Sequence, residues 1–389
     1  MSTGERSIDV LLVGGGVGAV RCARTLRRQK FDGSILLIGD EPAIPYNRPP
    51  LSKELLRDDL SDDLVAAEPA SWYERRGIEL RTATAVEAID PPGRRARLTD
   101  GTVVRYERCL LATGATARSL PVPGAERALL LRTLADARRL REAAVLAGPG
   151  APVVVIGAGF IGVEIASGLA SLGLEPTVVE IGERLWSGRL GSALAAWGEE
   201  RLRGAGVELR LGSAVSRLDE GAAWIGDERL PAGFVVAGIG VRPRDDLARD
   251  AGLEVDDGIV VDAGQRTSDA RIWAAGDVAR RGPRRVEHWH AARESGHRAA
   301  LGMLGQPTEA APQPWVFTEV AGTAVDVVGD ATAWDEERWI IDEGVLALAD
   351  AGRVVQMAAI DSGVSAARMR EIVAAGTPVE RVAEELRGP

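Results

Sequence analysis

The sequence predicts an α/β fold with two Rossmann-like dinucleotide-binding domains and a C-terminal α+β domain. An apolar strand, a glycine-rich turn and a helical pattern follow one another at residues 8–29 and again at residues 153–171. A chain of 389 residues is also longer than one hydrophobic core usually serves. Two such openings in a chain of this length predict two nucleotide-binding domains and leave room for a third.

Composition narrows the classes of function. Hydrophobic residues make up 46% of the chain and charged residues 27%, as in an ordinary soluble protein, and the net charge is −10. This acidic balance argues against nucleic acid or an anionic membrane as a partner. The apolar run at residues 153–174 contains five glycines and Glu164, so it predicts a buried strand, turn and helix and no membrane span. The start resembles no signal peptide and the two cysteines lie far apart, which together fit a cytoplasmic protein.

The first motif is the turn GGGVGA, which stands between the first apolar strand and a helical pattern. Gly14 and Gly16 permit a tight turn and close approach to a pyrophosphate, Ala19 holds the third position of the fingerprint, and the helix N-terminus favours the phosphate charge. The next expected strand is followed by two acids, Asp40 and Glu41. Asp40 is the first choice for the carboxylate that binds a ribose.

The second motif is the turn GAGFIG, with Gly157, Gly159 and Gly162 in the three fingerprint positions. It also lies between a strand and a helix, and the following strand ends at Glu180. A carboxylate there favours a free 2′-hydroxyl and hence NADH, because it would repel the 2′-phosphate of NADPH. Arg184 lies close enough in the sequence to leave NADPH open. Two motifs in the same context predict two dinucleotide sites.

Residues 45–53, PYNRPPLSK, resemble a segment of the ferredoxin reductases of bacterial oxygenase systems, the group that includes putidaredoxin reductase and, more distantly, apoptosis-inducing factor. The order and spacing of further segments extend the resemblance over nearly the whole chain: ATG at 112–114, LPVPG at 120–124, GIGVRP at 238–243, AGDV at 275–278 and EHW at 287–289. The resemblance implies an FAD-dependent oxidoreductase with the fold of the glutathione reductase-like superfamily.

The domain organisation implied by the resemblance is interrupted. An FAD-binding domain is expected from residues 1–115 and 245–315, with an NAD-binding domain at 116–244 inserted between them. A C-terminal α+β domain is expected at 316–389. The sequence agrees, because this last part reads as four short strands and then a helix that stops at Gly376.

The same resemblance assigns residues to the two cofactors. Asp277, at the end of a strand, is expected to hydrogen-bond the ribityl chain of FAD. A helix N-terminus at Glu287 and Trp289 is expected to bring backbone amides toward the flavin pyrimidine edge, unless Trp289 serves packing alone. The other residues expected at FAD are Arg48, Val86, Arg132 and Phe317, of which the arginines could instead be solvated, and those expected at NAD are Ile161, Gly238, Ile239 and Gly240.

Lys53 follows Pro-Pro-Leu-Ser and is expected to start a helix. By resemblance it lies near N5 of the flavin and pairs with Glu164, on the first turns of the helix in the NAD-binding domain. A fixed cation there would stabilise electron density as hydride arrives. Lys30 and Lys53 are the only lysines among 47 basic residues, which favours this role over an ordinary surface ion pair.

Metal and thiol chemistry are not predicted. His288, His290 and His297 fall within ten residues, but no cysteine or acidic cluster completes a ligand set at metal-site spacing. Cys22 and Cys109 have neither C-x2-C nor C-x4-C spacing, so both are expected to be packing residues. Electrons are therefore expected to leave the flavin without passing through a dithiol.

Two positions depart from the pattern of the family. Asn47 stands where an acid is common, and Phe317 stands where a tryptophan normally covers the nicotinamide side of the flavin. Trp315 lies two residues earlier in an expected strand, so it would point the same way and could partly compensate. Without that compensation the site would be roomier and could admit an organic substrate.

The leading interpretation is an NADH-dependent FAD oxidoreductase that passes electrons to a small iron–sulfur ferredoxin serving a Rieske or cytochrome P450 oxygenase. Two alternatives stay open. One is an NADH-dependent flavoenzyme that acts directly on a small organic metabolite, and the other is a redox-responsive binding protein similar to apoptosis-inducing factor. The sequence leaves open the identity of the acceptor and the choice between monomer and homodimer.

Overall fold

The computed structural model describes residues 6–58 and 60–387. The chain divides into two compact units. Unit 1 consists of Met1–Arg48, Ser61–Thr116 and Val241–Ala311, and unit 2 of Pro49–Leu60, Ala117–Gly240 and Pro312–Pro389. Each unit therefore combines segments that lie far apart in the sequence. The three-domain division expected from the resemblance stays a prediction.

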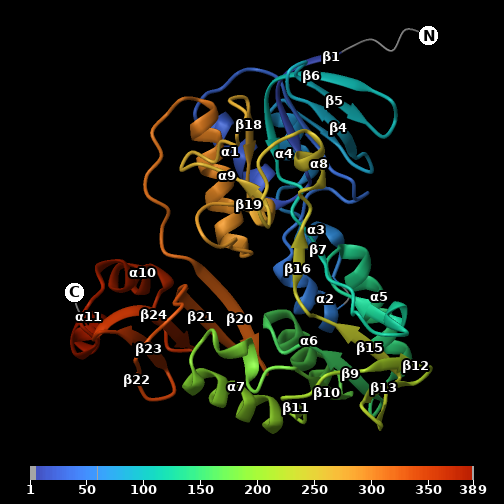
Figure 1. Ribbon diagram of the computed structural model, residues 1–389, viewed down its shortest axis with the longest axis vertical. Coiled ribbons are helices and arrows are strands. Elements are labelled where there is room, and N and C mark those ends of the chain that lie inside the picture. Colours follow the sequence, from blue (N-terminus) through green and yellow to red (C-terminus); the bar gives the residue numbers. More distant parts are fainter. Residues whose placement is uncertain (1–5, 59, 388–389) are drawn as a thin grey trace. The chain divides into compact units, whose positions relative to one another are not determined.

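Unit 1 is built on a seven-stranded sheet (Figure 1). Its strands are β1 (Arg6–Val13), β2 (Ile35–Ile38), β3 (Ile78–Arg81), β4 (Val86–Asp90), β5 (Arg95–Leu98), β6 (Val103–Leu111) and β18 (Ile272–Ala274). β1 lies between β2 and β6, β3 lies beyond β2, and β18 pairs with the end of β6, all in parallel. β5 and β4 extend antiparallel from the start of β6. β2, β18 and the second half of β1 are buried, which explains their continuous apolar sequences.

Two long helices of unit 1, α1 (Val17–Arg28) and α9 (Trp289–Met303), pack against each other. They approach closely because Gly296 has no side chain. A Cβ atom at this position would lie only 2.1 Å from the carbonyl oxygen of Gly18. The smaller elements are α3 (Asp62–Val65), α4 (Ala70–Arg75), α8 (Asp246–Asp250), the 3-10 turn η4 (Gly276–Val278), and the strand pairs β17 (Ile259–Val260) with β19 (Ala279–Arg280) and β7 (Ala115–Ala117) with β16 (Val241–Pro243).

Unit 2 contains a parallel sheet with the order β11-β10-β9-β15-β8. These strands are β8 (Ala128–Leu130), β9 (Pro152–Ile156), β10 (Glu175–Val179), β11 (Glu208–Arg210) and β15 (Phe234–Ala237). Around them lie η1 (Pro49–Ser52), α2 (Glu54–Arg57), η2 (Ala125–Arg127), α5 (Leu134–Ala147), α6 (Phe160–Ser171), η3 (Leu185–Gly188), α7 (Ser192–Gly204) and the antiparallel strands β12 (Arg217–Asp219), β13 (Ala222–Ile225) and β14 (Glu228–Pro231).

The C-terminal part of unit 2 forms a five-stranded antiparallel sheet in the order β20-β21-β24-β23-β22. Its strands are β20 (Trp315–Val320), β21 (Thr323–Gly329), β22 (Glu336–Ile341), β23 (Val345–Asp350) and β24 (Arg353–Ile360), followed by α10 (Ala366–Ala375), η5 (Val379–Arg381) and α11 (Val382–Arg387). Ser365 caps α10 by accepting a hydrogen bond from the Arg368 N–H. Gly376 ends the helix in the left-handed conformation, and this stop was predicted from the sequence.

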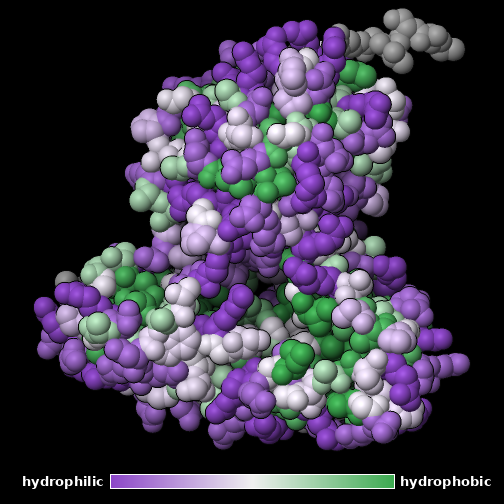
Figure 2. All heavy atoms as spheres, viewed as in Figure 1, coloured by the Kyte–Doolittle hydropathy of each residue, from purple (hydrophilic) through white to green (hydrophobic). Residues whose placement is uncertain are grey.

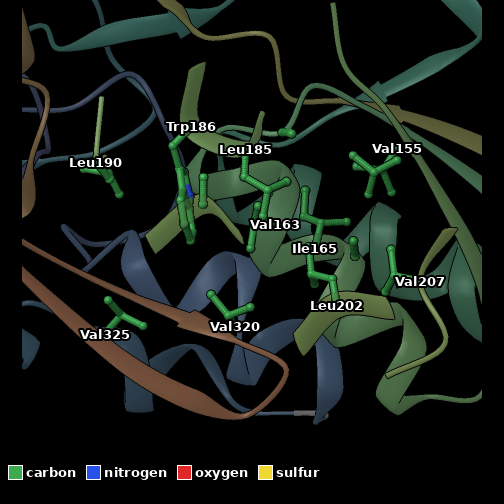
Figure 3. Close-up of a cluster of buried hydrophobic side chains, with 14 of the residues drawn as sticks. Val155, Val163, Ile165, Leu185, Trp186, Leu190, Leu202, Val207, Val320 and Val325 are labelled. Carbon is green, nitrogen blue, oxygen red and sulfur yellow. The ribbon is translucent and has the colours of Figure 1, made fainter. Parts of the chain in front are cut away.

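One hydrophobic core joins the two five-stranded sheets of unit 2. Figure 3 shows Val163 and Ile165 of α6, Trp186 of η3 and Val320 of β20 within this cluster. Leu56 of α2 belongs to the same core and is fully buried, which explains why the short segment Pro49–Leu60 groups with this unit and not with the residues on either side of it in the sequence.

The structure confirms the two predicted strand–turn–helix openings and the four C-terminal strands with their helix. The apolar run at residues 153–174 forms β9 and α6, and none of the helices in the described ranges is long and apolar enough to span a membrane. Hydrophilic residues cover most of the visible face in Figure 2. The fold class predicted from the sequence is therefore correct.

Candidate functional site

The first glycine turn in unit 1 has the geometry of a phosphate-binding loop. Gly14 has a φ of +117°, and a Cβ atom there would lie 2.1 Å from the carbonyl oxygen of Ala112, so only glycine fits. A Cβ atom at Gly16 would meet no atom within 4 Å, so this side of the turn is open. α1 begins at the next residue, and its N-terminus favours an anion. The loop therefore fits the pyrophosphate of a dinucleotide.

An arginine is held beside this loop by two neighbours. Arg48 forms an ion pair of 3.1 Å with Glu41, and the Tyr46 hydroxyl donates a hydrogen bond to the same carboxylate. Partial burial lowers the pKa of Arg48, but its neighbours Tyr46 and Glu41, with a contribution from Asp277, raise it above the ordinary value. Unit 1 therefore gathers Glu41, Arg48 and Asp277, which were all expected at FAD, from two separate segments.

Two further groups expected near this cofactor, Asp40 and Trp289, have partners within unit 1. Asp40, the first choice for the ribose, forms an ion pair of 2.8 Å with Arg244. The indole N–H of Trp289 donates a hydrogen bond of 2.9 Å to the side-chain oxygen of Asn47. Asn47 thus accepts the hydrogen bond that a carboxylate at this position would accept, but it brings no charge.

The second glycine turn, in unit 2, repeats the geometry with all three glycines. Gly157 has a φ of +101°, and a Cβ atom there would lie 2.6 Å from the carbonyl oxygen of Gly238. A Cβ atom at Gly162 would lie 1.9 Å from the carbonyl oxygen of Gly157, which explains the glycine in α6, whereas Gly159 is open. The loop at Gly238, Ile239 and Gly240 therefore lies against the turn, as expected for residues of one nucleotide site.

Glu180 is buried beside this second turn. Its carboxylate accepts hydrogen bonds from the backbone N–H groups of Ala158, at 2.6 Å, and Gly182, at 2.7 Å. Arg184, which left NADPH open in the sequence, forms an ion pair of 3.4 Å with Glu199. The acid is thus fixed at the turn, and the neighbouring cation has a carboxylate partner of its own.

A buried ion pair occupies the part of unit 2 where α2, α6 and β20 meet. Lys53 Nζ lies 2.6 Å from Glu164 Oε1, and the two side chains are only 9% and 3% exposed. The Thr318 hydroxyl donates a hydrogen bond of 2.7 Å to the same oxygen, and the Ser52 hydroxyl donates one to Glu164 Oε2. Three donors therefore surround one buried carboxylate, which is the arrangement that a buried charge requires.

The backbone explains why these side chains converge. η1 ends at Ser52 and α2 begins after Lys53, so both side chains leave the chain at one turn and reach α6. β20 brings Thr318 from a distant part of the sequence, and its neighbour Glu319 forms an ion pair with Arg57 of α2. The pairing of Lys53 with Glu164, inferred from the resemblance, is present in the structure.

The altered aromatic position lies next to this pair. Lys53 Nζ is 5.6 Å from the ring centre of Phe317, within the range of a cation–π interaction. The rings of Trp315 and Phe317 have their centres 6.3 Å apart, because alternate residues of a strand point to the same side. The sequence-based expectation that the two rings share one face of the strand is confirmed.

The residues expected at FAD are divided between the two units. Lys53, Arg132 and Phe317 belong to unit 2, whereas the first glycine loop belongs to unit 1, and Val86 lies on β4 in the antiparallel part of the unit 1 sheet. Their contact with FAD stays a prediction. The sequence analysis did not predict the role of Thr318, whose hydroxyl donates a hydrogen bond to Glu164. The one clue in the sequence was that Thr318 directly follows Phe317, the position that departs from the family pattern.

The two cysteines do not form a redox site. Cys22 in α1 and Cys109 in β6 are free and fully buried. Burial raises the pKa of both thiols, so neither is a reactive thiolate at neutral pH. Both side chains pack in hydrophobic clusters of unit 1, as the sequence predicts.

The fold and the two glycine loops define a flavin- and nicotinamide-type oxidoreductase. The family model of pyridine nucleotide-disulphide oxidoreductases matches residues 8–296, and the chain belongs to this family. It is 36% identical over 387 residues, 94% of each chain, to the ferredoxin–NAD(+) reductase component of the anthranilate 1,2-dioxygenase system of Burkholderia cepacia. It is 34% identical to rhodocoxin reductase of Rhodococcus erythropolis, over 88% of this chain and 83% of that protein.

Solved structures support the same grouping. The chain is similar to putidaredoxin reductase in its covalent complex with putidaredoxin, with a TM-score of 0.91 and 29% identity over 98% of each chain. It is also similar to the ferredoxin reductase for the CYP199A2 system of Rhodopseudomonas palustris, with a TM-score of 0.86 and 31% identity over 91% of each chain. The resemblance to ferredoxin reductases predicted from the sequence is confirmed.

Proposed function

We propose that this protein is an NADH-dependent FAD oxidoreductase that reduces an iron–sulfur ferredoxin. The observation that carries the proposal is the presence of one dinucleotide loop in each unit of a chain whose two thiols are fully buried in hydrophobic clusters of unit 1. When bound, FAD accepts an electron pair as hydride and releases electrons singly. One NADH and two oxidised ferredoxins would thus give NAD+, one proton and two reduced ferredoxins.

The proposed part of unit 1 is to hold FAD. Gly14 and Gly16 leave room for the pyrophosphate, and the N-terminus of α1 favours its charge. Glu41 and Asp277 supply carboxylates for hydroxyl groups of the cofactor, and Arg48, fixed by Glu41, supplies a cation near the phosphates. The relatives named as ferredoxin reductases support the choice of FAD.

The proposed part of Lys53 is to present one fixed positive charge to the flavin. Its ammonium is held by Glu164, which is itself held by Ser52 and Thr318. A charge fixed in this way needs no reorganisation when negative charge develops near it. Proximity of Lys53 to the flavin rests on the family resemblance.

We further propose that NADH is preferred over NADPH. Glu180 is buried at the second glycine loop with both carboxylate oxygens hydrogen-bonded to backbone N–H groups, so its negative charge is fixed where the ribose of the nucleotide would lie. A 2′-phosphate there would meet that charge. Arg184, the cation that left NADPH open in the sequence, is paired with Glu199.

Anaerobic stopped-flow reduction tests the proposal. The FAD-loaded protein should be bleached rapidly by NADH and slowly by NADPH, and the reduced protein should then reduce cytochrome c only when a ferredoxin such as putidaredoxin, or that of a relative's oxygenase system, is added. Rapid bleaching without transfer to any of these ferredoxins would contradict the acceptor. Equal rates of bleaching by NADH and NADPH would contradict only the role proposed for Glu180 and not the rest of the proposed function.

A further inference from the structure

The turn η3 lies against the second glycine turn in unit 2. The backbone N–H of Trp186 donates a hydrogen bond of 2.9 Å to the carbonyl oxygen of Ala158, and the N–H of Ala158 donates one to Glu180. The backbone of Ala158 is therefore held on both sides. Because the C=O and N–H groups of a trans peptide point in opposite directions, holding this carbonyl turns the N–H of Gly159 away from Trp186. Gly159 is the N-cap of α6, and N–H groups at the start of a helix are those that bind a phosphate.

The turn that supplies this hydrogen bond has an unfavourable backbone conformation. Trp186 has a φ of 55° and Ser187 a φ of 51°, so two consecutive residues other than glycine are left-handed. Such a conformation persists only where the surrounding structure imposes it. The indole of Trp186 is buried in the hydrophobic core shown in Figure 3, to which Val320 and Val325 of the C-terminal sheet also belong. Packing against that sheet thus offsets part of the strain.

The C-terminal sheet also holds the backbone that follows the turn. Gln356 of β24 is buried, and its side-chain NH2 group donates a hydrogen bond of 3.2 Å to the carbonyl oxygen of Arg189. The side-chain oxygen of Gln356 accepts a hydrogen bond of 3.1 Å from the N–H of Ala331, which fixes the orientation of the amide. The N–H of Arg189 in turn donates to the carbonyl oxygen of Trp186. One residue therefore separates Gln356 from the strained turn.

A carboxylate of the same sheet fixes the end of this segment, where α7 begins. Glu337 of β22 accepts hydrogen bonds of 2.8 Å from the backbone N–H groups of Ser192 and Ala193, and the indole N–H of Trp334 donates to the same carboxylate. Burial alone would raise the pKa of Glu337, but these hydrogen bonds outweigh burial, so the net effect is a lowered pKa. The ionised side chain thus anchors the chain between β10 and α7 to the C-terminal sheet.

We infer that Gln356 and Glu337 are positioning residues for NADH, which act through the turn at Trp186 on the peptide between Ala158 and Gly159. The inference rests on the proposed function, because it takes the second glycine turn as the NADH site. Without these side chains the strained turn is free to relax, and the Gly159 N–H is no longer held in one direction. A group that only orients the site affects the bound nucleotide before and during hydride transfer alike, so its loss raises the KM and leaves kcat unchanged.

Binding of the nucleotide to the FAD-loaded variant Q356M tests this role. Methionine has a similar volume but makes neither hydrogen bond of Gln356. The Kd for NAD+, measured by calorimetry, and the KM for NADH should both rise by about 3- to 10-fold, as for the loss of one hydrogen bond. The rate of flavin bleaching at saturating NADH should stay within about twofold of wild type.

The matched comparison for Glu337 lies on the same strand. E337Q should raise the Kd for NAD+ in the same direction as Q356M, because glutamine cannot accept hydrogen bonds on both atoms of its amide. The control is E336Q. Glu336 is the preceding residue of β22, points to the opposite face and pairs with Arg338 at 2.6 Å. This change should leave the Kd for NAD+ and the KM for NADH unchanged.

Glycine at position 187 distinguishes a positioning role from a merely structural one. Glycine adopts the left-handed conformation without the penalty that Ser187 carries, so the turn needs less support from Gln356. The double variant Q356M/S187G should therefore bind NAD+ more tightly than Q356M. Trypsin reports on the turn without any nucleotide, because Arg184 and Arg189 are both exposed. Cleavage after these two arginines, mapped by mass spectrometry, should be faster in Q356M than in wild type.

Each outcome decides something. An unchanged Kd for NAD+ in Q356M, or an equal rise in E336Q, would refute the positioning role while the proposed function stands. If S187G brings no improvement to Q356M, the left-handed turn does not connect Gln356 to the nucleotide and the inference fails. Circular dichroism and FAD content report on folding, and E337Q replaces Q356M if the latter does not fold. A wild-type protein that binds no NAD+ would refute both the NADH site and the inference.

Discussion

Replacing Glu164 with glutamine should destabilise unit 2 by far more than a glutamate-to-glutamine replacement at an exposed position of the same unit. Glu164 and Lys53 are 2.6 Å apart and nearly fully buried, and removing one partner of a buried ion pair costs about 3–5 kcal/mol. Glutamine keeps the shape, so no cavity forms. It also puts an NH2 group where a carboxylate oxygen accepted, so Ser52 or Thr318 must turn its hydroxyl to accept instead of donate, while the buried Lys53 loses its charged partner. We expect a loss at the upper end of that range.

The measurement is urea unfolding followed by circular dichroism and by tryptophan fluorescence, with the free energy taken where the two curves coincide. The matched control is E228Q in the same unit. Glu228 pairs with Arg210 at 3.0 Å, but the side chains are 50% and 39% exposed, so this change should cost at most about 1 kcal/mol. If E164Q loses no more than E228Q, the reasoning about a desolvated pair is refuted.

Three further predictions address glycines, thiols and pH. G162A should lower the melting temperature and weaken NADH binding, because its Cβ atom would lie 1.9 Å from the Gly157 carbonyl oxygen. The control is G204A at the end of α7, where a Cβ atom would meet no atom within 4 Å, and this change should raise the melting temperature slightly. The two buried cysteines should react with a thiol reagent only after urea unfolds the protein, and reaction of the native protein would contradict their burial. Burial alone would raise the pKa of Asp136, but the hydrogen bonds at the start of α5 outweigh burial, so the net effect is a lowered pKa. The ionised carboxylate therefore stabilises the fold above the pKa of the unfolded chain, and this contribution is lost as the pH falls through the pKa of the folded protein. D136N should therefore be less stable than wild type at pH 7, and the difference in melting temperature should shrink toward pH 3; a constant difference would contradict the assignment.

Local sequence signals predicted the parts of the fold that depend on short-range sterics. The turns at Gly14 and Gly157 require a positive φ in a strand-to-helix connection, and such a requirement is written in a few consecutive residues. The stop of α10 at Gly376 is local in the same sense. These features were read correctly because the glycine pattern that permits them is local, although the distant carbonyl groups of Ala112 and Gly238 also exclude a Cβ atom at the two turns.

The contacts that the sequence did not predict all depend on distant segments. Thr318 reaches Glu164 across 154 positions of sequence, and the hydroxyl of a threonine in a strand carries no mark of its buried partner. The Lys53–Glu164 pair was found only through the resemblance to known proteins.

The buried pair is better explained by function than by stability, and this can be tested. Apolar residues of similar volume in place of a buried ion pair are often neutral or stabilising by about 1–4 kcal/mol. The chain has only two lysines, and one of them, Lys53, is buried although burying a charge is unfavourable. This indicates that the charge serves a function. The variant K53M/E164L should therefore unfold at a urea concentration no lower than that of E164Q, while bleaching of its flavin by NADH slows by about 100-fold relative to wild type. If the double variant is stable and bleaches at the wild-type rate, the pair is a structural element of unit 2 and the flavin receives its positive charge from another residue.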